Sequence, residues 1–204
     1  MAHARPARHD PAVRAGGIRL GRPTAIRRRQ LLAAATRQTL TYAFVRSTLE
    51  TSGPERPALR SIAGDVGRGA SDFAAARGAL QAWVPQRALG ATVEPAGVTV
   101  VPGTTVLIVL ALGPVCVIAP NRIVAVVDEP RRYAFAYGTL PGHPERGEES
   151  FTVEHLADDT VRVTIRVQAR LSWRGWRIVD PLARLAQALT LRRYRRAVAA
   201  AVRA

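Results

Sequence analysis

The sequence predicts an α+β protein in which a curved antiparallel sheet of about six or seven strands wraps around a long C-terminal helix. Three observations lead to this fold class. From residue 104 onward, segments rich in β-branched residues alternate with short turns, as in antiparallel hairpins. In residues 161–172 apolar and polar side chains alternate without interruption. Residues 180–203 then carry apolar side chains at helical spacing.

The chain before the predicted sheet contains an arm, two helices and one short strand. Residues 1–23 mix Pro, Gly, His and Arg without apolar periodicity, so we expect a disordered basic arm. A basic amphipathic helix is predicted over residues 24–40, and a strand over residues 41–45, because TYAFV is aromatic and β-branched. A second helix is predicted from Ser71, a good N-cap residue, to Pro85, which ends it.

Three hairpins are predicted in the second half of the chain. Their turns are expected at residues 113–114, 129–131 and 157–159, where Gly, Pro and Asp gather. The strands that flank these turns are predicted at residues 104–112, 115–119, 122–128, 132–139, 148–156 and 160–172. Because only one face of the last strand is apolar, we expect an antiparallel sheet with one covered side.

The predicted closing helix has a plausible N-cap at Asp180 and extends about 36 Å at a rise of about 1.5 Å per residue. A bent sheet that grips such a helix forms a helix-grip fold. The sheet and the helix cannot close completely, so we expect a mostly apolar cavity between them. Arg193 stands at the angular position of the apolar stripe. Either the helix runs past the sheet there, which we favour, or Arg193 points into the mouth of the cavity.

Charge is concentrated at the two ends of the chain. The formal net charge is +15, and all 30 basic residues are arginine, which fits the codon bias of a GC-rich bacterial genome. Residues 1–40 carry nine arginines against Asp10, and residues 164–204 carry ten against Asp180. These ends are either solvated or a weak contact for an anionic surface, nucleic acid or membrane. Few aromatic residues stand among the arginines, which counts against recognition of single-stranded nucleic acid. We expect no sequence-specific nucleic-acid binding.

The remaining composition predicts a soluble cytoplasmic protein with residues 24–204 in a single domain. Cys116 is the only cysteine, which excludes an intrachain disulfide and a cysteine-based zinc site and fits a reducing compartment. The longest apolar run, residues 106–119, is shorter than the ~20 residues of a membrane span. We expect no secretory signal, because no apolar core follows an N-terminal charge. The sequence does not indicate an oligomeric state.

One segment carries a family resemblance. Residues 137–151, YGTLPGHPERGEESF, resemble the core motif of an uncharacterised family called domain of unknown function nineteen-ninety, and residues 67–83 and 180–185 resemble its first and last helices. Where that family often has a histidine after the tryptophan of the first helix, this chain has Gln86. The resemblance implies a START-like, birch-allergen-like helix-grip domain that binds a ligand in its cavity. That superfamily also contains enzymes, so the fold alone does not choose a function.

The same segment contains the candidate acid/base residues. His143 lies in a stiff Pro- and Gly-rich loop, with Glu145, Glu148 and Glu149 within six residues. A histidine near carboxylates can exchange protons near neutral pH, so an enzyme using residues 143–149 is one alternative, with His143, Glu145 and Glu149 as catalytic candidates. The other reading is a turn that His143 merely caps. No two-histidine spacing is present, so we expect neither a metal nor a cofactor.

Aromatic residues supply the candidate ligand contacts. Tyr133, Phe135 and Tyr137 alternate with small residues, and we favour the aromatic face as the cavity lining. Trp83 is predicted to belong to the core more than to the ligand site, and Arg193 is included as a residue near the cavity mouth. The leading hypothesis is therefore a protein that binds a small hydrophobic or amphipathic molecule between the sheet and the C-terminal helix.

Overall fold

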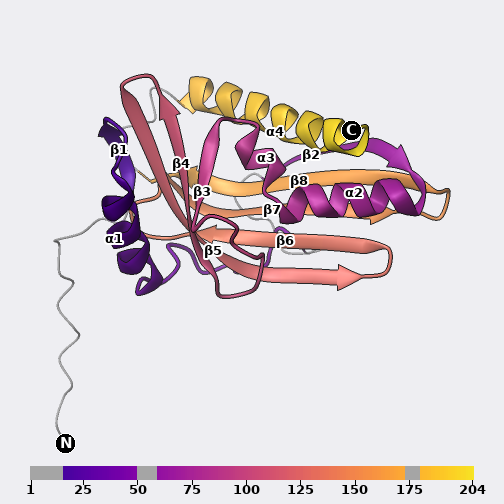
Figure 1. The fold of residues 1–204 in the computed structure, drawn as a ribbon, viewed down its shortest axis with the longest axis horizontal. Helices are drawn as coiled ribbons and strands as arrows, with labels where there is room; N and C mark the ends of the chain where they lie inside the picture. Colours follow the sequence, from indigo (N-terminus) through magenta and orange to yellow (C-terminus); the bar gives the residue numbers. More distant parts are fainter. Residues whose placement is uncertain (1–15, 50–58, 173–179) are drawn as a thin grey trace, which may run out of the picture.

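The computed structural model describes residues 16–49, 59–172 and 180–204, the first five residues of the last range by their backbone alone. It confirms the α+β helix-grip prediction, with an antiparallel sheet of eight strands (Figure 1). The strands are β1 Gly17–Leu20, β2 Arg60–Arg68, β3 Ala91–Glu94, β4 Thr105–Leu112, β5 Val115–Glu129, β6 Arg132–Thr139, β7 Glu145–His155 and β8 Thr160–Leu171. The helices are α1 Ala25–Thr36, α2 Gly69–Gln81, α3 Val84–Arg87 and α4 Asp180–Val202.

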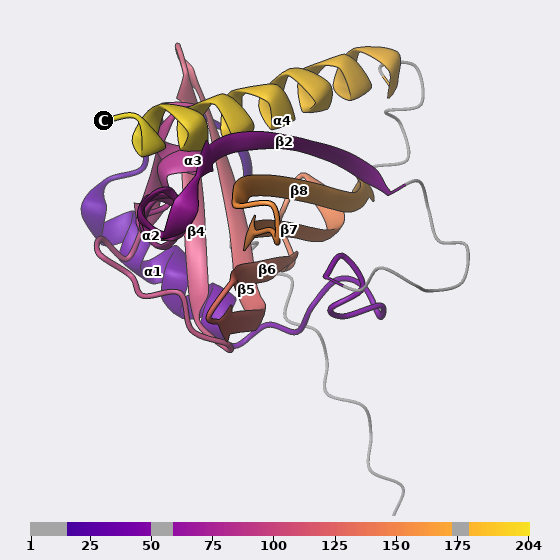
Figure 2. The ribbon, with the colours of Figure 1, turned by 90° about the vertical axis from the view of Figure 1, so that its right-hand side faces the viewer.

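The strands follow the order β2-β8-β7-β6-β5-β4-β3, and β1 pairs with β5 beside this path. Strand β5 pairs with β4 along its first half and with β6 along its second, so it carries the bend of the sheet. In Figure 2 the sheet curves from the steep strands β4 and β5 to β8 and β2, which run beneath α4. Helices α2, α3 and α4 cover the concave face, and α1 covers the other face of β4 and β5.

The prediction of two strands at residues 115–119 and 122–128 is wrong, because β5 runs through Pro120 without a break. The pairing explains why proline is tolerated there. On one side β5 pairs with β1 only as far as Ile118, and its pairing with β6 begins at Asn121. No neighbouring strand on that side therefore requires an N–H from residue 120.

The predictions for the N-terminal half need three more corrections. Residues 41–45 form no strand; they lie in turns and bends on the convex face. Residues 1–23 were expected to be a disordered arm, which is wrong for Gly17–Leu20, since these residues pair with β5 as β1; residues 1–15 lie outside the described residues. Strands β2 and β3 were not predicted. Strand β2 contains two glycines and two arginines, and β3 has only four residues, so neither carries a strong apolar pattern.

Helix α2 begins two residues before the predicted start. Its N-cap is Arg68, not Ser71, and the Asp72 carboxylate accepts a hydrogen bond from the Arg68 N–H at 2.8 Å. Pro85 does not stop a helix but occupies the first turn of α3, where its missing N–H has no cost. In the described part of the chain, no helix is both long and apolar enough to cross a membrane.

Candidate ligand-binding cavity

A cavity of about 400 Å³ lies between the concave face of the sheet and α4. Strands β4 to β8, the loop between β6 and β7, and α4 all contribute to its wall. Most of the wall is apolar, and its described apolar residues are Ile108, Leu110, Val117, Ala119, Pro144, Val167, Ala169, Leu171, Ala186 and Leu191. The predicted cavity between sheet and helix is therefore present in the structure.

The titratable centre of the cavity is Glu149 on β7. The Tyr137 hydroxyl on β6 donates a hydrogen bond to Glu149 Oε2, and the Gln86 side chain lies 3.4 Å from the same hydroxyl. Burial raises the pKa of Glu149 to about 8, and the neighbouring Glu145 adds to the increase, although the hydrogen bond from Tyr137 opposes it. Glu149 is therefore a neutral carboxylic acid at pH 7. Burial also raises the pKa of Tyr137 well above its ordinary value.

His143 lies in the wall of the cavity and is a neutral imidazole. The backbone N–H of Glu145 lies 2.8 Å from His143 Nδ1, and an amide N–H can only donate. The Glu145 carbonyl oxygen lies 3.0 Å from the same Nδ1 and can only accept, so the two backbone contacts favour opposite tautomers of the ring. Burial lowers the pKa of His143 to about 4. Proton exchange by His143 near neutral pH was expected from the nearby carboxylates. Because burial lowers the pKa of His143 and raises that of Glu149, Glu149 is the group whose pKa lies nearer to neutrality.

Glu145 connects the loop to α4 and β2. Gln187 on α4 donates a hydrogen bond of 3.4 Å to Glu145 Oε1, and Arg60 on β2 donates one to Gln187 Oε1. Burial raises the pKa of Glu145, and the charge of Arg60 partly offsets this. Glu145 and Glu149 are thus two desolvated carboxyl groups. They lie close enough together for Glu145 to raise the pKa of Glu149.

Asn121 on β5 adds an unpartnered acceptor to the wall. Its side-chain Nδ2 donates to the Ala119 carbonyl at 3.0 Å, which fixes the orientation of the amide. The Oδ1 atom is fully buried and has no hydrogen-bond partner among the described residues. A buried acceptor without a donor is unfavourable, so Asn121 leaves an unsatisfied polar group in a residue of the cavity wall.

Residues 41–197 match the family described as Domain of unknown function (DUF1990). The chain belongs to this family. A stretch of 76 residues is 43% identical to the UPF0548 protein of Deinococcus radiodurans, and it covers 37% of this chain and 38% of that protein. The match therefore spans well under half the length of that relative.

Two solved structures are similar to this DUF1990 protein. The hypothetical protein jhp0584 of Helicobacter pylori has a TM-score of 0.56 at 11% identity, covering 79% of this chain and 98% of that one. The crystal structure of Ara h 8.0201 has a TM-score of 0.46 at 16% identity, covering 71% of this chain and 98% of that one. At this identity the likeness to jhp0584 shows the fold alone.

The structure brings together all three acid/base candidates of the DUF1990 chain, since His143, Glu145 and Glu149 line one cavity. The side chain of Glu148, the residue before Glu149, forms its hydrogen bonds on the opposite face of β7. It is 1% exposed and accepts hydrogen bonds from the Tyr42 hydroxyl, the Arg46 and Thr48 N–H groups and the Thr48 hydroxyl. Glu148 therefore holds the segment of residues 41–49 against the convex face.

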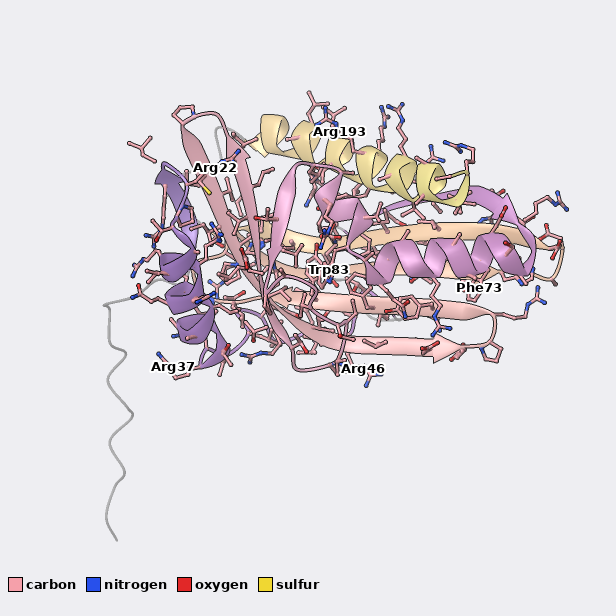
Figure 3. All side chains as sticks on the ribbon, in the orientation of Figure 1. Arg22, Arg37, Arg46, Phe73, Trp83 and Arg193 are labelled. Carbon is pink, nitrogen blue, oxygen red and sulfur yellow. The ribbon has the colours of Figure 1, made fainter. Side chains whose placement is uncertain are left out.

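The predicted aromatic contacts divide between the cavity and the core. Tyr137 lines the cavity, whereas Tyr133, Phe135 and Trp83 are at most 1% exposed and pack in the core beneath α2. Arg193 is exposed on the outer side of α4, away from the sheet, so it is not a wall residue (Figure 3). Both interpretations of Arg193 are wrong. Helix α4 packs against the sheet around this position through the buried Leu191, Tyr194 and Val198, whereas the predicted apolar face, with Leu185 and Leu189, is exposed together with Arg193.

Polar wall residues that were not predicted include Asn121, Thr139, Gln187, Thr190 and Tyr194. Asn121 interrupts an apolar stretch and was a detectable signal. Tyr194 lies on the same buried face of α4 as Leu191 and Val198, and nothing in the sequence alone distinguishes it from a core tyrosine. In the described part of the chain, no group of three or more His, Cys, Asp or Glu side chains is placed to hold a metal ion.

Proposed function

We propose that this DUF1990 protein binds a small hydrophobic or amphipathic molecule in the cavity between the sheet and α4. The observation that carries the proposal is the cavity itself. Its volume of about 400 Å³ falls within the roughly 300–1,000 Å³ of small-molecule sites, near the lower end. Its mostly apolar wall with a few polar groups has the composition of such sites.

The wall also has both an apolar and a polar part, as the binding of an amphipathic molecule requires. Apolar side chains of β4, β5 and β8 surround most of the space, with Val117 and Val167 on opposing strands. The polar groups of the wall include the hydrogen-bonded pair Tyr137 and Glu149, and His143. A ligand with an apolar body and one polar end would satisfy both parts of the wall.

Three probes with the same octyl chain test this proposal: 1-octanol, octylamine and octanoate. Binding is measured by calorimetry on the full chain and on Ala119→Phe, which places a ring in the cavity wall. Ala63→Phe is the matched control, because Ala63 is exposed on β2. We expect at least one probe to bind wild type and Ala63→Phe but not Ala119→Phe. The proposal is overturned if no probe binds, or if Ala119→Phe binds as well as wild type. Native mass spectrometry of the purified protein identifies any molecule that copurifies.

An acid/base enzyme is the second candidate, and one observation favours it. The cavity holds a neutral carboxylic acid, Glu149, whose pKa of about 8 lies near physiological pH, together with the neutral imidazole of His143. Perturbed groups of this kind concentrate at catalytic sites. If a copurifying molecule is turned over, Glu149→Gln should reduce kcat at least about 100-fold, the usual contribution of a general acid. Unchanged turnover in Glu149→Gln would exclude this candidate.

A further inference from the structure

The ionisable groups of the cavity wall differ in kind from those of the rest of the molecule. The chain has a net charge of +15 and 30 arginines, yet no arginine lines the described part of the cavity. The carboxyl groups that line it are those of Glu145 and Glu149, on the strand β7 that forms its floor. A cavity for a carboxylate or phosphate would be expected to use some of the available arginines.

We propose that the polar end of the ligand is a cationic hydrogen-bond donor, an amine, held by Glu149, Glu145 and the free Oδ1 of Asn121. This proposal rests on the function proposed above and specifies the ligand class. All three groups offer acceptor oxygens, and an ammonium group offers three N–H donors and no acceptor. Such a group would give Asn121 Oδ1 the partner that it lacks within the described structure.

The aromatic residues of the wall favour the same ligand. Tyr137 on β6 and Tyr194 on α4 both line the cavity, and Tyr194 packs 5.4 Å from Phe151 between ring centroids. Faces of tyrosine rings attract organic cations, particularly in a desolvated site. Tyr137 and Tyr194 therefore add aromatic wall beside the carboxyl groups, with 4% and 6% of the two residues exposed.

The protonation states of the carboxyl groups in the wall agree with a site that binds a cation. In the free protein, two partly buried carboxyl groups lie near each other with no cation in direct contact, so a proton is retained on Glu149 at neutral pH. The other groups that face them are Tyr137, Tyr194 and the neutral His143, while Arg60 reaches Glu145 only through Gln187. An ammonium ion that enters this site would replace the proton, so binding should release a proton to solvent.

The same three octyl probes test the ligand class. We expect octylamine to bind at least tenfold more tightly than 1-octanol at pH 7.5, and octanoate to bind most weakly. Because binding competes with the proton on Glu149, octylamine affinity should rise with pH, by at most about tenfold per unit below a pKa of about 8. Calorimetry in buffers of different ionisation enthalpy should show proton release on binding octylamine and none on binding 1-octanol.

Glu149→Gln should remove the proton release and most of the preference for octylamine over 1-octanol. Glu154→Gln is the matched control, because Glu154 lies on the same strand but faces Arg132 at 3.8 Å outside the cavity. If 1-octanol or octanoate binds as tightly as octylamine, and binding is lost in Ala119→Phe, the cavity is a ligand site but the amine assignment is wrong. If none of the three probes binds, both proposals fail. If Glu149→Gln retains the full preference for octylamine, Glu149 does not hold the amine and the assignment is overturned.

Discussion

The two halves of the concave face carry different side chains and differ in what fills them. Beneath α2, large rings occupy the space: Trp83 and Phe135 have centroids 5.4 Å apart, and Phe135 and Phe151 stack at 5.2 Å. Toward the other end of α4, the sheet presents small residues such as Ala119 and Ala169 beside the carboxyl groups of Glu145 and Glu149. One half is a packed core, whereas the other leaves about 400 Å³ open.

This difference shows how one sheet serves both stability and binding. Aromatic packing in the first half stabilises the fold, so the second half tolerates groups that are unfavourable in a core, such as desolvated carboxyls and the unpartnered Asn121 Oδ1. Tyr137 lies at the border, since its ring is 6.0 Å from that of Trp83 and its hydroxyl bonds to Glu149. Substitutions in each half should therefore have separable effects on stability and binding.

The largest effect should come from the packed half. Phe135→Ala removes a fully buried ring that contacts Trp83, Tyr137 and Phe151. The expected loss in the free energy of unfolding is about 3–5 kcal/mol, from lost burial and the cavity that remains. Urea denaturation of the two proteins measures the difference. A loss below about 1 kcal/mol would mean that this half is not the packed core that the comparison requires.

The second-largest effect should come from adding an aromatic ring, which the packed half should tolerate less well than the cavity half. Ala76 is fully buried on α2, so Ala76→Phe should overpack the core and cost about 3 kcal/mol. The same change at Ala119 enters open space and should cost less than about 1.5 kcal/mol. Thermal and urea unfolding of both variants gives the comparison. Equal destabilisation would indicate that the second half has no room for a ring.

The ionisable groups of the cavity half should make the free energy of unfolding depend on pH. The folded-state pKa of Glu149 is raised to about 8, so the folded protein holds this proton more tightly than the unfolded chain, and stability falls as pH rises from about 4.5 to about 8. The pKa of His143 is lowered to about 4, so its contribution rises between about pH 4 and 6.5 and opposes that of Glu149 there. Above pH 6.5 the effect of Glu149 should dominate.

Between pH 6.5 and 8.5 the wild-type protein should therefore lose about 2 kcal/mol of unfolding free energy, since a pKa unit corresponds to about 1.36 kcal/mol. Glu149→Gln should show a much flatter curve in this range, and Glu154→Gln should follow wild type. Urea denaturation across the pH series provides the measurement. If Glu149→Gln retains the wild-type slope, Glu149 is ionised in the folded protein and the proposed protonation state is wrong.

The smallest effect should come from the outer side of α4. Arg193 is exposed and lies outside both halves, so Arg193→Ala should change the free energy of unfolding by less than about 0.5 kcal/mol. Binding of the octyl probes should also remain unchanged. A clear loss of probe binding in Arg193→Ala would restore the predicted role of this residue at the cavity mouth and would weaken the assignment of an arginine-free wall.

The sequence predicted the regions whose pattern is local. Three such features were predicted: the alternation of apolar and polar residues in β8, the turns before β6 and after β7, and the long closing helix. They were enough to predict the fold class and the place of the cavity. Strands β1 and β2 were missed because their pairing partners lie far along the chain, and Gly64 and Gly67 remove the apolar signal from β2. Register also decided the site, because Glu148 and Glu149 are indistinguishable in sequence and face opposite sides of β7.

A crystal structure of the full chain soaked with octylamine at pH 7.5 tests the central claim most directly. We expect electron density for an octyl chain between Ala119, Val167 and Leu191, with the nitrogen within hydrogen-bond distance of Glu149 and Asn121 Oδ1. An interior in which side chains close the space between the sheet and α4, with no density for the amine, would contradict it.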